Sequence, residues 1–230
     1  MLLEVKNLIK SYAGPDGTLA LTGESGSGKS TLLHLVGGLD LADGGEIWLD
    51  GRDVTGLDDA GRAALRRTQV GVIFQQFNLI PSMTVGANIA FHARLADRSD
   101  ASREAELAQA LGLTEQLHKY PEQLSGGQQQ RVANARTLAA RPALILADEP
   151  PGNLAPHLAI DILTLFEELH ATGTTVLFAT HDHSLIAKRN HRLISIDEGR
   201  VLEARQGLAS WRSDAPPAPA EEPVTPADNP

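Results

Sequence analysis

The sequence predicts an α/β fold in which helices cover both faces of a mostly parallel β-sheet. Short apolar runs typical of buried strands alternate along the chain with longer segments of helical periodicity. Strands separated by helices of this length are joined by right-handed crossovers, which make neighbouring strands parallel. The runs expected to form the sheet are TLALTG (18–23), VGVIF (70–74), ALILAD (143–148), TTVLFAT (174–180) and HRLISID (191–197).

Helices are expected between these strands. KSTLLHLVGGL should be helical until Gly37 and Gly38 end it. Residues 57–67 carry acids early and arginines late, which matches the helix dipole. Residues 84–118 are expected to be helical throughout, and further helices are expected at 156–170 and around 183–188.

A second, smaller set of strands is expected near the N-terminus. EVKNLIKSY, residues 4–12, reads as a strand and is followed by a turn at 13–17. EIWLDGRDV, residues 46–54, is expected to form two strands joined by a turn at Asp50 and Gly51.

The composition excludes several classes of protein. A chain of 230 residues with 42% apolar residues can build one large domain or two small ones. It contains no cysteine, so a disulfide framework or a thiolate metal site is impossible. A net charge of −9 argues against binding nucleic acid through a general basic surface. No run approaches the roughly 18 apolar residues of a membrane helix, and the start of the chain resembles neither a signal nor a transit peptide.

The stretch GESGSGKST, residues 23–31, lies between two apolar runs and predicts a phosphate-binding loop. Glycines allow backbone N–H groups to turn toward phosphate oxygens, and a helix that starts near Lys29 adds the positive end of its dipole. Lys29 is expected to reach the β and γ phosphates, and the Ser30 hydroxyl to bind Mg²⁺. The alternative is an ordinary turn between a strand and a helix. The predicted nucleotide-binding residues are Gly23, Glu24, Ser25, Gly26, Ser27, Gly28, Lys29, Ser30 and Thr31.

The run LILADEP places two acids at the end of a buried strand. This position is the carboxyl edge of the sheet, where α/β folds bind ligands. Asp148 is suited to hold Mg²⁺, and Glu149 to orient and deprotonate an attacking water. The alternative is a pair of acids that only cap the strand end.

LSGGQQQRVANAR, residues 124–136, predicts the start of another helix. Ser125 followed three residues later by Gln128 forms a capping box. Gly126 and Gly127 leave the first turn without side chains, which favours a second anion site; the alternative is an ordinary helix start.

GESGSGKST, LSGGQ, LILADEP and ATHD together resemble the nucleotide-binding subunit of ATP-binding cassette (ABC) transporters, from about residue 2 to about 203. The resemblance implies a P-loop NTPase cassette, with a mostly parallel sheet core, an antiparallel β edge and an α-helical subdomain. It also implies an ATP-binding domain at 1–212 with the helical subdomain inserted at about 78–140. The composition of residues 213–230, rich in proline, alanine and acids, predicts a disordered tail.

The same resemblance implies an active unit of two copies arranged head to tail, with two ATP molecules at their interface. The signature residues Ser125, Gly126, Gly127 and Gln128 would then act on the ATP that the other copy holds.

Further roles follow from the resemblance residue by residue. Gln75 would touch Mg²⁺ and the attacking water and sense the membrane partner, with Gln76 the less favoured candidate. His181 would contact the γ-phosphate, and Tyr12 would stack on adenine. Catalysis would rest on Glu149, His181, Lys29 and Gln75, with Mg²⁺ held by Ser30, Gln75 and Asp148.

The implied function is ATP hydrolysis that powers an integral-membrane permease, with ATP and Mg²⁺ as cofactors and no nucleic acid as partner. The chain would be cytoplasmic and attached through the permease to the inner face of the membrane. The phrases GKSTLLHLVGGLD and ADEPPGNL are similar to the LolD-like and MacB-like branch of lipoprotein release and macrolide export. The alternatives are an FtsE-like regulatory ATP switch and a degenerate member that binds ATP with little turnover.

Three positions depart from the family pattern. Ala155 replaces an acid that crosses the dimer interface, which implies weaker coupling between the two ATP sites. Pro151 replaces a threonine and stiffens the turn after Pro150. Tyr12 lies only 11 positions before Gly23, whereas family members have more residues between these positions, so the connection is short for its ring to reach the adenine.

Overall fold

The computed structural model describes residues 18–150, 156–171, 173–181 and 192–206. Within these residues, six strands form one sheet in the order β4-β5-β6-β1-β7-β8. The first five are parallel, whereas β8 runs antiparallel to β7 at the edge. The predicted class of sheet is confirmed, and β8 adds to the strands that the sequence predicts. The strands are β1 (Thr18–Thr22), β4 (Val70–Ile73), β5 (Leu144–Asp148), β6 (Thr175–Ala179), β7 (Arg192–Asp197) and β8 (Arg200–Gln206).

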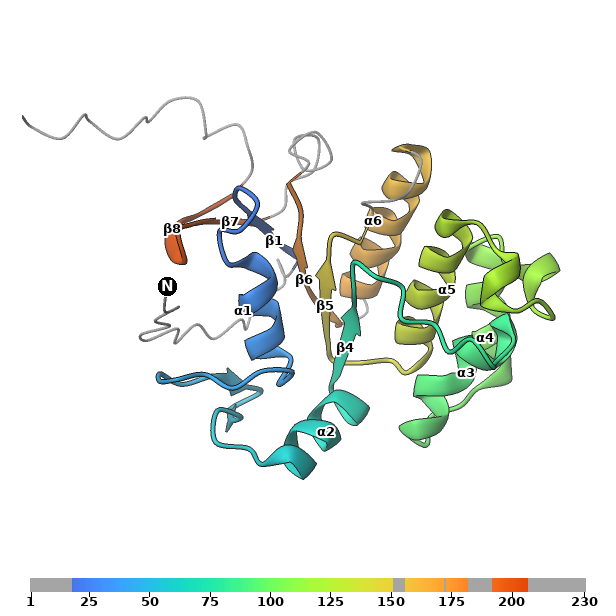
Figure 1. Cartoon of the computed structure of the whole chain (residues 1–230), viewed down its shortest axis with the longest axis horizontal. Coiled ribbons are helices and arrows are strands. Elements are labelled where there is room, and N and C mark those ends of the chain that lie inside the picture. The colour runs from blue at the N-terminus through green and yellow to red at the C-terminus, as the bar shows by residue number, and fades with distance from the viewer. Residues whose placement is uncertain (1–17, 151–155, 172, 182–191, 207–230) are drawn as a thin grey trace, which may run out of the picture.

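The core lies on both faces of the sheet, because successive strand residues point to opposite sides. Leu19 and Leu21 of β1 pack in one cluster with Leu33 of α1. Ala20, which lies between them, belongs to a second cluster that contains Phe166 of α6. Figure 1 shows α1 and α6 on opposite sides of the sheet. Burial on both faces explains why these strands are continuous apolar runs.

The helices surround the sheet in two groups. α1 and α2 belong to the first core cluster. α3, α4 and α5 lie beyond β4 and β5 and form what we call the helical group (Figure 1). The predicted hairpin forms with Asp50 and Gly51 at its turn, both at positive φ. The helices are α1 (Lys29–Val36), α2 (Asp59–Thr68), α3 (Val85–Leu95), α4 (Ala101–Ala110), α5 (Gly126–Ala139) and α6 (Pro156–Ala171), and the hairpin strands are β2 (Trp48–Leu49) and β3 (Arg52–Asp53).

Residues 84–118 are not helical throughout, and that prediction was wrong. A break at 96–100 separates α3 from α4. Asp97 adopts a left-handed φ of 54°, and the Asp100 side chain accepts hydrogen bonds from the first backbone N–H groups of α4. A left-handed residue ends one helix and an N-cap begins the next. Apolar periodicity on both sides of the break hides these two local signals.

Several expectations lie outside the described residues. They concern the strand at 4–12 with its turn at 13–17, the helix around 183–188, the tail at 213–230, and the residues Tyr12, Pro151 and Ala155. The domain limits at 1–212 and about 78–140 remain predictions. In the part of the chain that the structure describes, no helix combines the length and apolar character of a membrane span.

His92 on α3 makes the stability of the helical group dependent on pH. Burial, and secondarily the positive charge of Arg136, lower the pKa of His92 from 6.5 to about 4. Between these pH values His92 is protonated in the unfolded chain but not in the folded chain. The free energy of unfolding therefore falls as the pH drops from 6.5 toward 4.

We expect this difference to lower the free energy of unfolding by up to about 3 kcal/mol across that window. Urea titrations from pH 7 to 4 measure it. His92→Gln should lose this part of the pH dependence, while a glutamine at His118, which is exposed, should keep it. Identical pH profiles for the parent and His92→Gln would contradict the assignment.

Candidate functional site

The predicted phosphate-binding loop connects β1 to α1. Gly23 and Gly28 have φ values of 148° and 106°, which side chains strongly disfavour. A Cβ on Gly23 would also lie 2.1 Å from the carbonyl oxygen of Ile196. The glycine pattern therefore fits both the backbone path and the close approach of β7.

The start of α1 is left open to an anion. Its N-cap is Gly28, and no side chain caps the helix. By contrast, Asp58, Thr84, Asp100 and Ser125 cap the starts of α2, α3, α4 and α5 with side-chain oxygens. Uncapped N–H groups at the positive end of a helix dipole form an anion-binding position. The predicted loop is therefore the one described α-helix start, among these five, that keeps its N–H groups free of a side-chain cap.

Lys29 places its positive charge inside the loop. Its Nζ donates hydrogen bonds to the carbonyl oxygens of Gly23 at 2.8 Å and Glu24 at 2.7 Å. The residue is only 8% exposed. These bonds hold the ammonium where it adds to the positive field of the helix start.

The turn between β7 and β8, which the sequence does not predict as part of the site, also holds the loop. Gly199, between β7 and β8, donates its N–H to the carbonyl oxygen of Ser27 at 2.9 Å. Glu198 and Gly199 both have positive φ. The residues DEGR at 197–200 are typical of a turn, but only the fold brings Gly199 against Ser27, which lies 172 positions earlier.

The predicted catalytic residues follow neighbouring strands at one edge of the sheet. Asp148 ends β5 and pairs in register with Ala179, the last residue of β6. Glu149 comes immediately after β5, His181 follows the end of β6 by two residues, and Gln75 follows β4 by two residues. Because β4, β5, β6 and β1 are parallel neighbours, all of these residues and the loop after β1 lie at the same edge.

Glu149 and His181 are in direct contact. Glu149 Oε1 lies 2.7 Å from His181 Nδ1 and accepts a hydrogen bond from the His181 backbone N–H at 3.2 Å. An ionised carboxylate only accepts, so this contact is a hydrogen bond in the tautomer that carries a proton on His181 Nδ1. The Glu149 side chain is 13% exposed and that of His181 is 72% exposed. Glu149 also has a left-handed φ of 50°, an uncommon conformation for a residue with a side chain.

The signature segment forms the predicted capping box. Ser125 Oγ accepts from Gln128 N at 3.3 Å, and Gln128 Oε1 accepts from Ser125 N at 2.9 Å. Gly126 and Gly127 then begin α5 without side chains. In Figure 1 this helix lies on the other side of β4 and β5 from α1, so the structure does not bring the signature segment to the loop of the same chain.

The oxygen atoms at the sheet edge suit a magnesium ion. Ser30 lies in the first turn of α1, Asp148 ends β5, and Gln75 follows β4. Hydroxyl, carboxylate and amide oxygens are hard donors of the kind that Mg²⁺ prefers. The chemistry of this donor set therefore fits the ion.

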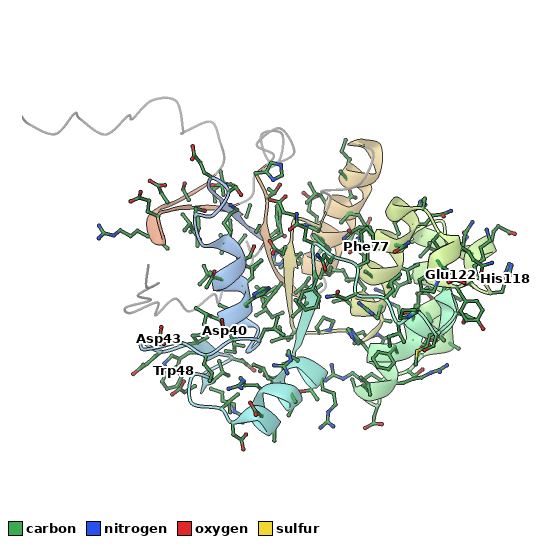
Figure 2. All side chains as sticks on the ribbon, in the orientation of Figure 1. Asp40, Asp43, Trp48, Phe77, His118 and Glu122 are labelled. Carbon is green, nitrogen blue, oxygen red and sulfur yellow. The ribbon has the colours of Figure 1, made fainter. Side chains whose placement is uncertain are left out.

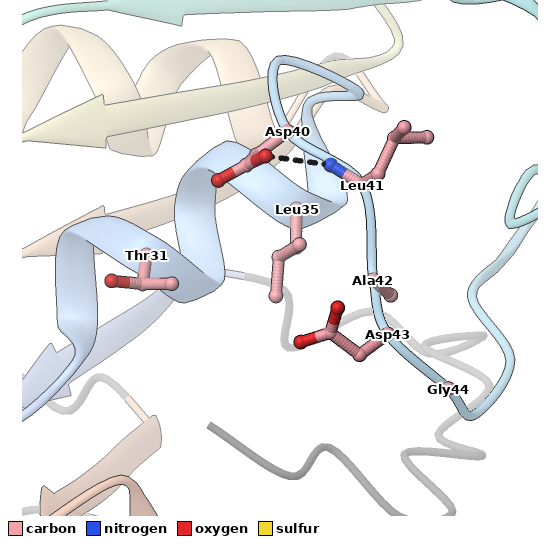
Figure 3. Close-up of a pocket in the computed structure, with 7 residues that line it drawn as sticks. All are labelled: Thr31, Leu35, Asp40, Leu41, Ala42, Asp43 and Gly44. Carbon is pink, nitrogen blue, oxygen red and sulfur yellow. Dashed lines mark hydrogen bonds between the residues drawn. The ribbon is translucent and has the colours of Figure 1, made fainter. Parts of the chain in front are cut away.

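Of the predicted nucleotide-binding residues, only Thr31 lines one of the two hollows on the described surface. A cavity of about 90 Å³ lies beside α1 and contains Asp40, whose Oδ1 accepts from Leu41 N at 2.8 Å, and Asp43 (Figure 3). Ligand pockets usually measure about 300–1,000 Å³, and two carboxylates disfavour phosphate. A wider hollow of about 720 Å³ lies between Arg98, Ser99, Asp100 and Arg141, away from all the predicted site residues.

Comparison with known proteins decides the family. The family model described as ABC transporter matches residues 8–152, more than half of the chain. The chain belongs to the ABC transporter family. It therefore carries the ATP-binding domain of this family of ATPases.

Relatives with different roles are similar to this ABC protein. It is 44% identical over 184 residues to the cell division ATP-binding protein FtsE of Escherichia coli, covering 79% of this chain and 82% of FtsE. It is 43% identical over 234 residues to the macrolide export ATP-binding/permease protein MacB of Hyphomonas neptunium, covering 94% of this chain but only 36% of MacB. The methionine import ATP-binding protein MetN of Rhizobium johnstonii is 40% identical over 218 residues, covering 89% of this chain and 60% of MetN. The LolD/MacB branch is thus one of several that resemble the chain.

Solved cassettes share the fold. The dimeric post-hydrolysis structure of the cassette MJ0796 bound to ADP and Pi has a TM-score of 0.78 and 35% identity, covering 84% of this chain and 86% of that chain. Another dimeric structure of MJ0796, a bacterial ABC transporter cassette, has a TM-score of 0.77 and 36% identity, covering 83% of this chain and 85% of that chain. The predicted cassette fold is confirmed.

Proposed function

We propose that this ABC subunit hydrolyses ATP at a site shared by two copies of the chain and so powers a membrane permease that exports or releases its substrate. The loop of one copy would hold the phosphates, and the signature segment of the other would close the site. The observation that carries the proposal is the Glu149–His181 contact of 2.7 Å beside an uncapped, lysine-containing loop. Glu149 would activate the water while His181 orients that carboxylate.

Mg²⁺, when bound, would neutralise charge on the phosphates, held by Ser30, Gln75 and Asp148. The chain's own residues would do the rest. Lys29 and the open end of α1 would bind the phosphates, and the signature glycines would let a second copy approach closely. Attachment to a permease would place the chain on the inner face of the membrane.

A second candidate function is an FtsE-like switch that signals to a membrane partner without moving a substrate. The match to FtsE supports it, since that match covers 82% of FtsE, whereas the match to MacB covers 36% of MacB. Co-purification of the membrane partner, followed by measurement of ATP turnover, separates the two functions. Transport predicts a permease whose substrate stimulates turnover. A switch predicts a membrane partner that transports no substrate.

Mixing two inactive variants tests the shared site. Lys29→Ala removes the charge in the loop, and Gly126→Asp places a negative charge in the first turn of α5, where an acid suits the helix dipole but repels phosphate. A Cβ at Gly126 meets nothing closer than 3.8 Å, so this variant should fold. Each variant alone should lack Mg²⁺-dependent phosphate release.

The mixture should regain up to about a quarter of the parent turnover, since half of a random mixture is mixed dimers with one intact site of two. Lys29→Ala mixed with the double variant is the matched control and should stay inactive. Absence of recovery in the first mixture would contradict a site built from two copies.

A further inference from the structure

Arg136 is a buried cation that the predicted chemistry does not use. It lies on α5 and is 4% exposed. Its two terminal nitrogens donate to the carbonyl oxygens of Asn78 at 2.7 Å and Phe77 at 3.1 Å. No described carboxylate forms an ion pair with it, and burial lowers its pKa. Burying a guanidinium costs free energy, and without an ion pair only its hydrogen bonds to backbone oxygens offset that cost.

The bonded carbonyls belong to the segment that begins with Gln75. Phe77 and Asn78 follow Gln75 by two and three residues, and Asn78 has a left-handed φ of 47°. A planar guanidinium that donates to two successive carbonyl oxygens fixes both the position and the orientation of that peptide. The path of the chain after Gln75 is therefore tied to α5.

A second contact ties the same segment to the other end of the helix. A Cβ on Gly126 would lie 3.8 Å from Cζ of Phe77, so the Phe77 ring lies over the first turn of α5. Figure 2 shows Phe77 between the sheet and the helical group. Ten residues separate Gly126 from Arg136, about 15 Å of helix. Phe77 is thus held at both points along α5.

The next part of the chain is held by a different helix. Asn88 of α3 is fully buried, donates to the carbonyl oxygens of Ile80 and Met83, and accepts from Ile80 N. Among the described side chains, Arg136 alone provides hydrogen bonds from α5 to Phe77 and Asn78. On the other side of Gln75, Thr137 of the same helix donates from Oγ1 to the carbonyl oxygen of Val72 at 3.2 Å.

We propose that Arg136 is a positioning residue that locks the Gln75 segment to the signature helix, so that Gln75 and Ser125 move as one body when two copies close on ATP. This inference rests on the proposed function, since it concerns how the two halves of that site move together. Arg136 would act only through its hydrogen bonds to the backbone of Phe77 and Asn78.

Spin labels test the lock without requiring ATP turnover. The chain contains no cysteine, so Gln76→Cys and Gln109→Cys introduce two unique and exposed labelling sites, one beside Gln75 and one on α4. The distance distribution between the labels should be narrow in the parent and at least twice as wide in Arg136→Met. Arg136→Lys should broaden it as well, because an ammonium lacks the planar fork. Arg103→Met, on α4 and paired with Glu106 at 3.7 Å, is the matched control and should stay narrow.

Turnover and unfolding measurements complete the test. Without the labels, Arg136→Met should lower kcat by about tenfold or more and change KM less than threefold, since misplacement of a reacting group affects the chemical step more than binding. Urea titration checks that Arg136→Met folds. If it does not fold, the same measurements are made on Arg136→Lys. Unchanged label distances and kcat in either folded variant would overturn the proposal. A parent that does not hydrolyse ATP would instead refute the proposed function, and the label distances would still decide the role of Arg136.

Discussion

Replacing Glu149 with glutamine is expected to lower ATP turnover by about 100-fold or more while leaving the affinity for ATP within threefold, because general-base catalysis typically contributes about 10²–10⁴. Glutamine has the same shape as glutamate, and its Oε1 can still accept from His181. The contact of 2.7 Å and the strand-end geometry should therefore persist. Only the capacity to take a proton from water is lost.

Phosphate release and equilibrium nucleotide binding, measured on the same preparation, separate the two effects. Glu122→Gln makes the same chemical change on an exposed residue at the outer end of the helical group (Figure 2) and should leave both quantities unchanged. A Glu149→Gln variant that keeps more than a fifth of the parent turnover would show that another group activates the water.

The sequence predicts the local backbone geometry of the loop, the strand ends and the signature helix, because short motifs specify that geometry. The glycines of the loop require backbone angles that few other residues adopt, and Ser125 and Gln128 satisfy the helix start within four residues. The strand ends at Asp148 and Ala179 follow from continuous apolar runs that only a sheet buried on both faces explains.

Contacts that depend on strand order are beyond the sequence pattern. Glu149 and His181 lie 32 positions apart and meet because β5 and β6 are neighbours in register. The Gly199 bond to the loop requires that β7 lie beside β1. Arg136 lies in a helical run whose pattern predicts only which face is buried. Nothing in the sequence around it predicts its hydrogen bonds to residues 77 and 78.

The roles of the site residues stay predictions, and the geometry supports the proposal that a second copy completes the site. The loop, Glu149 and His181 share one edge of the sheet, whereas Ser125 begins a helix on the far side of β4 and β5. The start of α1 carries no side-chain cap and is therefore open. An open half-site of this kind favours completion by a second copy.

Gly23→Ala is expected to lower the free energy of unfolding by about 3 kcal/mol and to weaken ATP binding by about tenfold or more. The new methyl group would lie 2.1 Å from the carbonyl oxygen of Ile196 and 2.7 Å from Ser27 Oγ, at a φ of 148°. Overpacking and backbone strain each cost about 1–3 kcal/mol. Because one obstacle is the backbone of β7, the loop rather than the strand should move. This movement would displace the N–H groups that are expected to bind the phosphates.

Urea titration and ATP binding at a temperature where the variant is folded measure the two losses separately. Gly56→Ala is the matched control, because a Cβ there meets nothing within 4 Å and its φ is not left-handed. If Gly23→Ala lost stability but kept its ATP affinity, β7 would have yielded instead of the loop. The end of β7 at Ile196 would then be the part that moves in this contact, and the loop would keep its shape without a rigid support from β7.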